Sequence, residues 1–122
     1  MAGKILVIDD EKSIGELIQL AMQTKGYHVE YVMNGNDGLS LFCRLRPDIV
    51  LVDKRLPDMD GIEVARQIKQ TEAGKSARLM LMTGDISEKD LDRSLFAGAI
   101  EKPVSMSKLA GLIEGVMSVN SH

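Results

Sequence analysis

Acidic side chains directly follow two short apolar runs in the N-terminal half of the chain. Asp9 and Asp10 come after the run Ile5–Ile8, and Asp53 comes after the run Ile49–Val52. Carboxylates that lie close together repel each other, which raises their pKa values and costs stability unless a cation lies between them. A few hard oxygen ligands suit Mg²⁺, which keeps several waters and often binds a phosphate as well. If these acids meet in the fold, they predict a Mg²⁺ site with room for a phosphoryl group.

Two more side chains that can contact a phosphoryl group follow later apolar segments. Thr83 comes after the run Leu79–Met82, and Lys102 closes the brief segment 99–102. Three aspartates and one lysine give this group a formal charge of −3 + 1 = −2. A divalent cation would cancel that excess.

The strands that must position these residues are visible in the hydrophobic pattern. Apolar residues at every position of a run, rather than at every second one, are typical of parallel strands covered on both faces. The segment 27–32 is less uniformly apolar, which predicts an edge strand. Five strands are expected in all, at 5–8, 27–32, 49–52, 79–82 and 99–102.

Helical periodicity separates these strands. Gly26 predicts a left-handed end to the first helix, Pro47 stops the second, and Ser87 is expected to cap a short fourth helix. Apolar residues at helical spacing predict five helices, with the faces Ile14, Leu17, Ile18 and Ala21; Leu39, Phe42 and Leu45; Val64, Ala65 and Ile68; Leu91 and Leu95; and Leu109, Leu112, Ile113 and Val116.

The alternation of strands and helices predicts a doubly wound α/β domain with an open five-stranded parallel sheet. Ligands of such sheets bind outside the carboxyl ends of the strands, where the winding changes direction. Residues that follow the apolar runs would then lie at one edge of the sheet. The three aspartates, Thr83 and Lys102 are therefore expected to form one site.

The composition is that of a soluble globular protein. The 122 residues suffice for one domain, 1–122, of which 44% are hydrophobic and 27% charged. The net charge is −3 and Lys and Arg do not form runs, so we expect no basic surface for direct nucleic-acid binding. The single cysteine, Cys43, excludes an internal disulfide, and its place beside Leu39 and Phe42 predicts a core role. No stretch approaches the roughly 20 apolar residues of a membrane span, so we expect a cytoplasmic protein.

Four motifs at the strand ends resemble the receiver domain of two-component response regulators, and the resemblance spans essentially the whole chain. They are VIDDE, LVDKRLPDMDG, MTG and EKP, after the first, third, fourth and fifth strands. The resemblance implies a flavodoxin-like sheet of order 2-1-3-4-5 and phosphorylation of Asp53 by a sensor histidine kinase or a phosphotransfer protein. It also implies output to an effector protein or a C-terminal output domain, with no catalysis beyond self-phosphorylation and self-dephosphorylation.

The resemblance also implies a role for each site residue. Asp10 would ligate Mg²⁺ directly with assistance from Asp9, Thr83 would hydrogen-bond the phosphoryl group, and Lys102 would pair with it. The remaining Mg²⁺ ligands would be Asp53 and the backbone carbonyl of Arg55.

Arg55 and Asp85 flank this site, because each lies two residues beyond a site residue in sequence. We expect them to form an ion pair that covers the phosphoryl group and slows its hydrolysis. The alternative is two solvated surface charges, since exposed pairs contribute only ~0–1 kcal/mol.

The sequence departs from the family pattern near its fifth strand. The family usually has an aromatic residue three positions before the lysine, where this chain has Ala99. The interval from Thr83 to Lys102, 102 − 83 = 19 residues, is a few residues shorter than usual. We therefore expect a shortened fourth-helix and fifth-strand region with a truncated or mobile output surface, and Phe96 as a packing residue.

Other functions account for the residues less well. A haloacid dehalogenase type phosphatase needs a second aspartate where Arg55 stands, and an FMN carrier needs an uncharged phosphate loop where DDEKS stands. The remaining alternative is a receiver-like interaction module that phosphorylation does not switch. Asp58 and Asp60 are expected to cap the third helix, and residues 74–76 are expected to be a surface loop rather than part of a P-loop.

Overall fold

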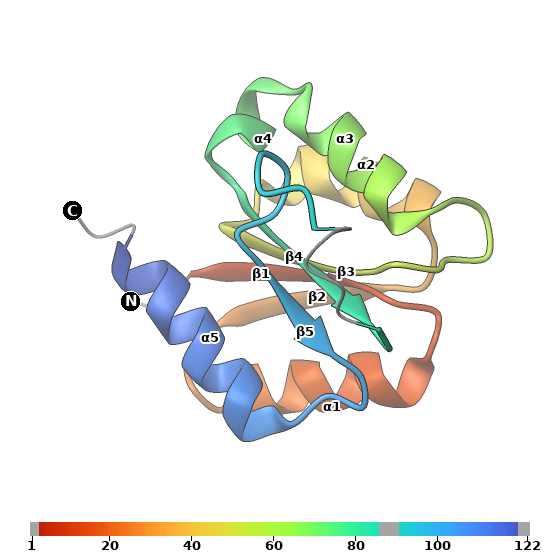
Figure 1. Cartoon of the computed structure of the whole chain (residues 1–122). Helices are drawn as coiled ribbons and strands as arrows, with labels where there is room; N and C mark the ends of the chain where they lie inside the picture. The colour runs from red at the N-terminus through yellow and green to blue at the C-terminus, as the bar shows by residue number, and fades with distance from the viewer. Residues whose placement is uncertain (1–2, 86–90, 120–122) are drawn as a thin grey trace.

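The computed structural model describes residues 3–85 and 91–119, which build one five-stranded sheet (Figure 1). All the strand pairs are parallel, and the order β2-β1-β3-β4-β5 confirms the predicted topology. The strands are β1 (Lys4–Ile8), β2 (His28–Val32), β3 (Ile49–Asp53), β4 (Arg78–Thr83) and β5 (Gly98–Glu101).

Helices cover both faces of the sheet (Figure 1). On one face lie α1 (Lys12–Gln23) and α5 (Met106–Val119), and on the other lie α2 (Gly35–Leu45), α3 (Gly61–Lys69) and α4 (Glu72–Ser76). No helix in the described ranges is long and apolar enough to cross a bilayer.

The uniformly apolar strands serve two separate cores. Successive side chains of β1 alternate, so Ile5 and Val7 pack with α1 and α5, whereas Leu6 and Ile8 pack with Phe42 of α2. Every apolar side chain of β1 and β3 is fully buried, which is why these runs lack the polar positions of a half-exposed strand. The more polar β2 lies at the sheet edge, as predicted.

Two loop aspartates hold different helices. Asp60 caps α3 and accepts a hydrogen bond from the Ile62 amide at 2.7 Å. Asp58 instead accepts the amides of Gly35 and Asn36, both at 2.8 Å, so the prediction that Asp58 caps the third helix is wrong. It binds the first turn of α2, whose free amides favour a carboxylate and lower the pKa of Asp58.

Within the described residues, the fourth helix in chain order lies elsewhere than predicted. Residues 91–97 contain a turn and no helix, and Ser87 lies outside the described residues. The fourth helix, α4, precedes β4 and ends at Ser76, where a surface loop was expected. Thr71 caps it by accepting the Gly74 amide at 2.9 Å. The region between β4 and β5 is accordingly short, and Phe96 is buried there beside Leu79 and Leu81.

Three apolar side chains expected in the core are exposed, namely Cys43, Leu17 and Leu112. Leu112 is 42% exposed, one position from the buried Ile113. Cys43 lies on the solvent side of α2, because the inward face of that helix runs through Gly35, Gly38 and Phe42. Leu17 is 47% exposed, one position from the buried Ile18. Gly26, by contrast, has the predicted positive φ, 93°.

Candidate functional site

Strand register brings the predicted residues to one edge of the sheet. Ile8 pairs with Val52, Asp53 pairs with Met82, and Thr83 pairs with Glu101. The ladder then continues, with the Lys102 amide donating to the Thr83 carbonyl at 2.8 Å. A cavity of about 580 Å³ opens there, lined by Asp10, Glu11, Asp53, Lys54, Arg55, Thr83, Gly84, Asp85 and Lys102.

Three aspartates meet at this edge of the sheet, and two of them, Asp10 and Asp53, line the cavity. One carboxylate oxygen from each of Asp9, Asp10 and Asp53 lies within 4.8 Å of the other two. Asp9 is fully buried and Asp53 is 7% exposed, whereas Asp10 is exposed to solvent. Asp9 Oδ1 accepts the Glu11 amide at 2.9 Å, but Asp9 Oδ2 is buried and accepts no hydrogen bond of good geometry within the described residues. Such an oxygen, beside two other carboxylates, fits a hard divalent cation.

Lys102 is the cation that faces these acids. Its Nζ lies 3.0 Å from Asp9 Oδ2, 2.9 Å from Glu11 Oε1 and 3.3 Å from Asp53 Oδ2. Burial acts to lower the pKa of Lys102, but its contacts with Glu11 and Asp9 and the charge of Asp53 outweigh burial and raise that pKa. Lys102 is therefore firmly protonated.

The Asp53 carboxyl group is costly to ionise. Burial and then the charge of Asp9 raise the pKa of Asp53 to about 6, against the opposing effect of Lys102. The group is still mostly ionised at neutral pH, as a nucleophile must be.

The loop after β3 depends on a glycine. Gly61 donates its amide to the Lys54 carbonyl at 2.8 Å, and a Cβ at Gly61 would overlap the backbone carbonyl oxygen of Asp53. Only glycine lets the start of α3 approach the end of β3 this closely. The position of Asp53 is thus set by packing as well as by the strand.

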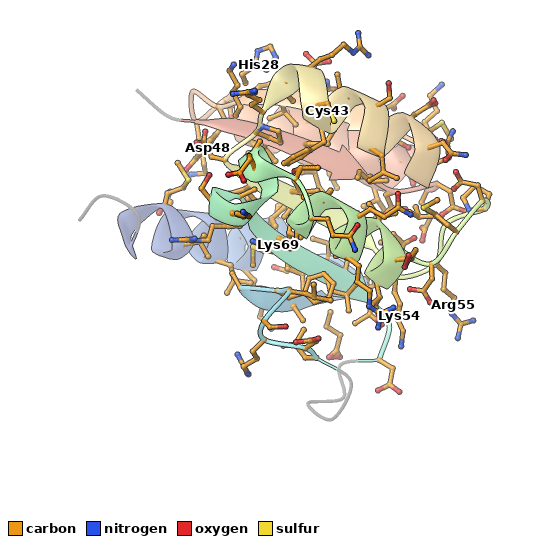
Figure 2. All side chains as sticks on the ribbon, turned by 90° about the horizontal axis from the view of Figure 1, so that it is seen from above. His28, Cys43, Asp48, Lys54, Arg55 and Lys69 are labelled. Atoms are coloured by element: carbon orange, nitrogen blue, oxygen red, sulfur yellow. The ribbon has the colours of Figure 1, made fainter. Side chains whose placement is uncertain are left out.

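The Thr83 hydroxyl faces its own loop. Its Oγ1 lies 3.2 Å from both the backbone oxygen and the backbone nitrogen of Asp85. Arg55 and Asp85 both line the cavity, yet no ion pair within 4.0 Å joins these two described side chains. Figure 2 shows the Arg55 side chain directed away from the body of the protein. The expected ion pair is therefore absent from this structure.

Two residues at the site were not predicted from the sequence. Glu11 binds Lys102, and the run of three acids in VIDDE was a signal for it. Tyr31 donates its hydroxyl to the backbone carbonyl of Asp9 at 2.9 Å. Nothing in the pattern of β2 marks this tyrosine, because it becomes a neighbour of Asp9 only when β2 pairs with β1.

Comparisons with known proteins agree with this geometry. The response regulator receiver domain family matches residues 5–114. The chain is 28% identical to the transcriptional regulatory protein TrcR of Mycobacterium tuberculosis, over 98% of this chain and 47% of that protein, so it spans about half the length of this curated relative.

Solved structures show the same fold. The chemotaxis response regulator CheY4 of Vibrio cholerae matches with a TM-score of 0.90 and 25% identity, over 95% of this chain and 99% of that chain. The signal receiver domain of a signal transduction histidine kinase from Syntrophus aciditrophicus matches with a TM-score of 0.83 and 28% identity, over 96% and 91%. With its parallel sheet and acidic pocket, the chain belongs to the response regulator receiver domain family of two-component systems.

Proposed function

We propose that the chain is a phosphorylation-dependent signalling switch whose phosphoacceptor is Asp53. The observation that carries this proposal is the approach of three carboxylates within 4.8 Å beside the Lys102 ammonium group, 3.3 Å from Asp53. A purely structural cluster of this charge would be costly, because the raised pKa of Asp53 reflects unfavourable burial and repulsion. Binding of a cation and a phosphoryl group would explain why the protein has a cluster that is unfavourable by itself.

Asp9, Asp10 and Asp53 would hold Mg²⁺, with the backbone carbonyl of Arg55 as a further ligand. Bound Mg²⁺ supplies positive charge that offsets the charge of the phosphoryl oxygens. A hard cation suits this all-oxygen donor set. Asp9 Oδ2 supports the assignment, because this buried oxygen has the Lys102 ion pair but accepts no hydrogen bond of good geometry, and a cation would compensate it.

The chemistry assigns a role to each remaining side chain. A carboxylate oxygen of Asp53 attacks the phosphorus of a phosphohistidine in line, a new O–P bond forms, and the N–P bond breaks with its electron pair leaving on the histidine nitrogen. Lys102 stabilises charge on the phosphoryl oxygens and must loosen its contact with Glu11 to do so. The Thr83 hydroxyl exchanges its contact with Asp85 for a phosphoryl oxygen, which draws its loop toward Asp53.

In hydrolysis, a water oxygen attacks the phosphorus, the O–P bond to Asp53 breaks, and inorganic phosphate leaves while the Asp53 carboxylate is restored. We propose that this hydrolysis is slow. Arg55 and Asp85 stand on the loops on either side of the cavity. Once a phosphoryl group is present, their side chains would restrict the approach of water. They therefore modulate the lifetime of the phosphorylated state.

The partners follow from this reaction. We propose that a sensor histidine kinase or a phosphotransfer protein donates the phosphoryl group in the cytoplasm. The receiver, residues 1–122, then acts on an effector protein or on an output domain. Its only catalysis would be its own phosphorylation and dephosphorylation.

Intact mass spectrometry after incubation with acetyl phosphate and Mg²⁺ tests the proposal. The wild-type chain should gain one phosphoryl group, and Asp53→Asn should gain none. Asp48→Asn is a matched control, because Asp48 stands just before the opposite end of the same strand, where it accepts the Lys4 amide. Equal labelling of Asp53→Asn and wild type would exclude Asp53 as the acceptor, and no labelling of wild type would favour a receiver-like module that phosphorylation does not switch.

A further inference from the structure

Tyr31 connects the edge strand to the acidic turn. In β2 it pairs with Val7 of β1, and its hydroxyl reaches beyond the end of β1 to the backbone carbonyl of Asp9, 2.9 Å away. The Asp9 amide is also held, because it donates to the Val32 carbonyl at 3.1 Å. The backbone of Asp9 is thus bonded on both sides by β2.

The ring of Tyr31 lies in a fixed slot. It packs so closely on Gly15 of α1 that a Cβ at Gly15 would overlap ring atoms Cδ1, Cε1 and Cζ. Since a tyrosine ring has few rotatable bonds, a ring held in this way also fixes the position of its hydroxyl. Gly15 is therefore required by Tyr31 rather than by the conformation of α1.

The turn that Tyr31 holds carries three acids of the site. Asp9 and Asp10 belong to the carboxylate cluster, and Glu11 contacts Lys102 at 2.9 Å. Glu11 also donates its amide to Asp9 Oδ1, so a shift of the Asp9 backbone would move all three acids. A tyrosine hydroxyl is protonated at neutral pH and can therefore donate this hydrogen bond to the Asp9 carbonyl.

We propose that Tyr31 is a positioning residue for the cation site, acting through the Asp9 carbonyl to hold the turn Asp9–Glu11 in its binding geometry. This role of Tyr31 depends on the proposed function in one respect, which is that the bound cation is Mg²⁺. Tyr31 itself contacts neither the cation nor the phosphoryl group.

The test compares the only two tyrosines of the chain. Tyr31→Phe removes one hydroxyl and keeps the ring, and Tyr27→Phe is the matched control, because Tyr27 is a partly buried tyrosine packed against the core of α1 and α5. Calorimetric titration with Mg²⁺ should show about three- to tenfold weaker binding for Tyr31→Phe, the range expected for one lost hydrogen bond. Tyr27→Phe should bind like wild type.

A second readout needs no metal. In the metal-free protein, amide hydrogen exchange at residues 10–12 should become faster in Tyr31→Phe and remain unchanged in Tyr27→Phe. Gly15→Ala, which displaces the ring and leaves the hydroxyl in the chain, should reproduce both effects. Unchanged exchange at residues 10–12 in Tyr31→Phe, or Mg²⁺ affinity equal to wild type, would overturn the proposal. If wild type itself bound no Mg²⁺, the proposed function would fail, and the exchange data would still decide the role of Tyr31.

Discussion

The raised pKa of Asp53 predicts an unusual pH dependence of stability in the metal-free protein. The pKa of Asp53 in the folded protein is about 6, against an ordinary aspartate pKa of 3.8. Because the folded state then binds the proton more tightly than the unfolded chain, protonation of Asp53 stabilises the fold. This contribution grows as the pH falls below about 7, and it is lost as the pH rises through about 6.

The expected magnitude follows from proton linkage. With these two pKa values, the free energy of unfolding should rise by about 1.3 kcal/mol between about pH 7 and about pH 5. For a domain of this size that corresponds to an increase of roughly 5 °C in Tm.

Thermal and urea unfolding in EDTA at both pH values provide the assay. Asp53→Asn removes the titrating group, so the difference between wild type and variant isolates the contribution of Asp53 from that of every other group. Asp85→Asn, which removes an exposed carboxylate from the same cavity, should follow wild type. If wild type and Asp53→Asn had the same pH dependence, Asp53 would not carry a raised pKa and the electrostatic account of the site would be wrong.

Further predictions concern the same edge of the sheet. Asp10→Asn should weaken Mg²⁺ binding in calorimetry while making the metal-free fold more stable in thermal melts, by a small amount since Asp10 is exposed. Gly61→Ala should lower the free energy of unfolding by about 1–3 kcal/mol in urea, because its Cβ would overlap the Asp53 carbonyl; a neutral result would mean that the loop can move. Replacing Arg55 and Asp85 together with Ala should speed decay of the phosphorylated protein, and an unchanged decay rate would leave them as solvated charges. Addition of beryllofluoride and Mg²⁺ should change the rate of amide hydrogen exchange mainly on the α1 side of the sheet. Changes concentrated on residues 91–104 would show instead that the family's usual output surface, near the fifth strand, is intact.

The sequence by itself determined the fold and the three aspartates of the acidic site. Runs such as Ile5–Ile8 and Ile49–Val52 are apolar at every position, which only a strand buried on both faces requires. Parallel strands all end at one edge, so the residues after them had to converge whatever the details of packing. Asp9, Asp53 and Lys102 could be placed together for this reason, and the ion pairs of Lys102 with both aspartates confirm that they meet.

Helix faces were less determined by local pattern. Spacing alone puts Cys43 near Phe42, but a rotation of about 100° per residue carries it to the solvent side once Gly35, Gly38 and Phe42 face the sheet. The short helix before β4 was also missed, because five residues with a Thr71 cap give too little periodicity to detect.

Only the tertiary structure decided how the acids differ and what holds them. Asp9 and Asp10 are neighbours of the same type, yet one is fully buried and the other exposed, because the chain turns between them at the end of β1. Asp58 binds α2 rather than α3, and Tyr31 binds the turn after β1, through contacts 22 to 23 residues apart in sequence. Such contacts depend on the path of a loop and the length of one side chain. Those quantities are fixed when the sheet assembles, and no local pattern of residues encodes them.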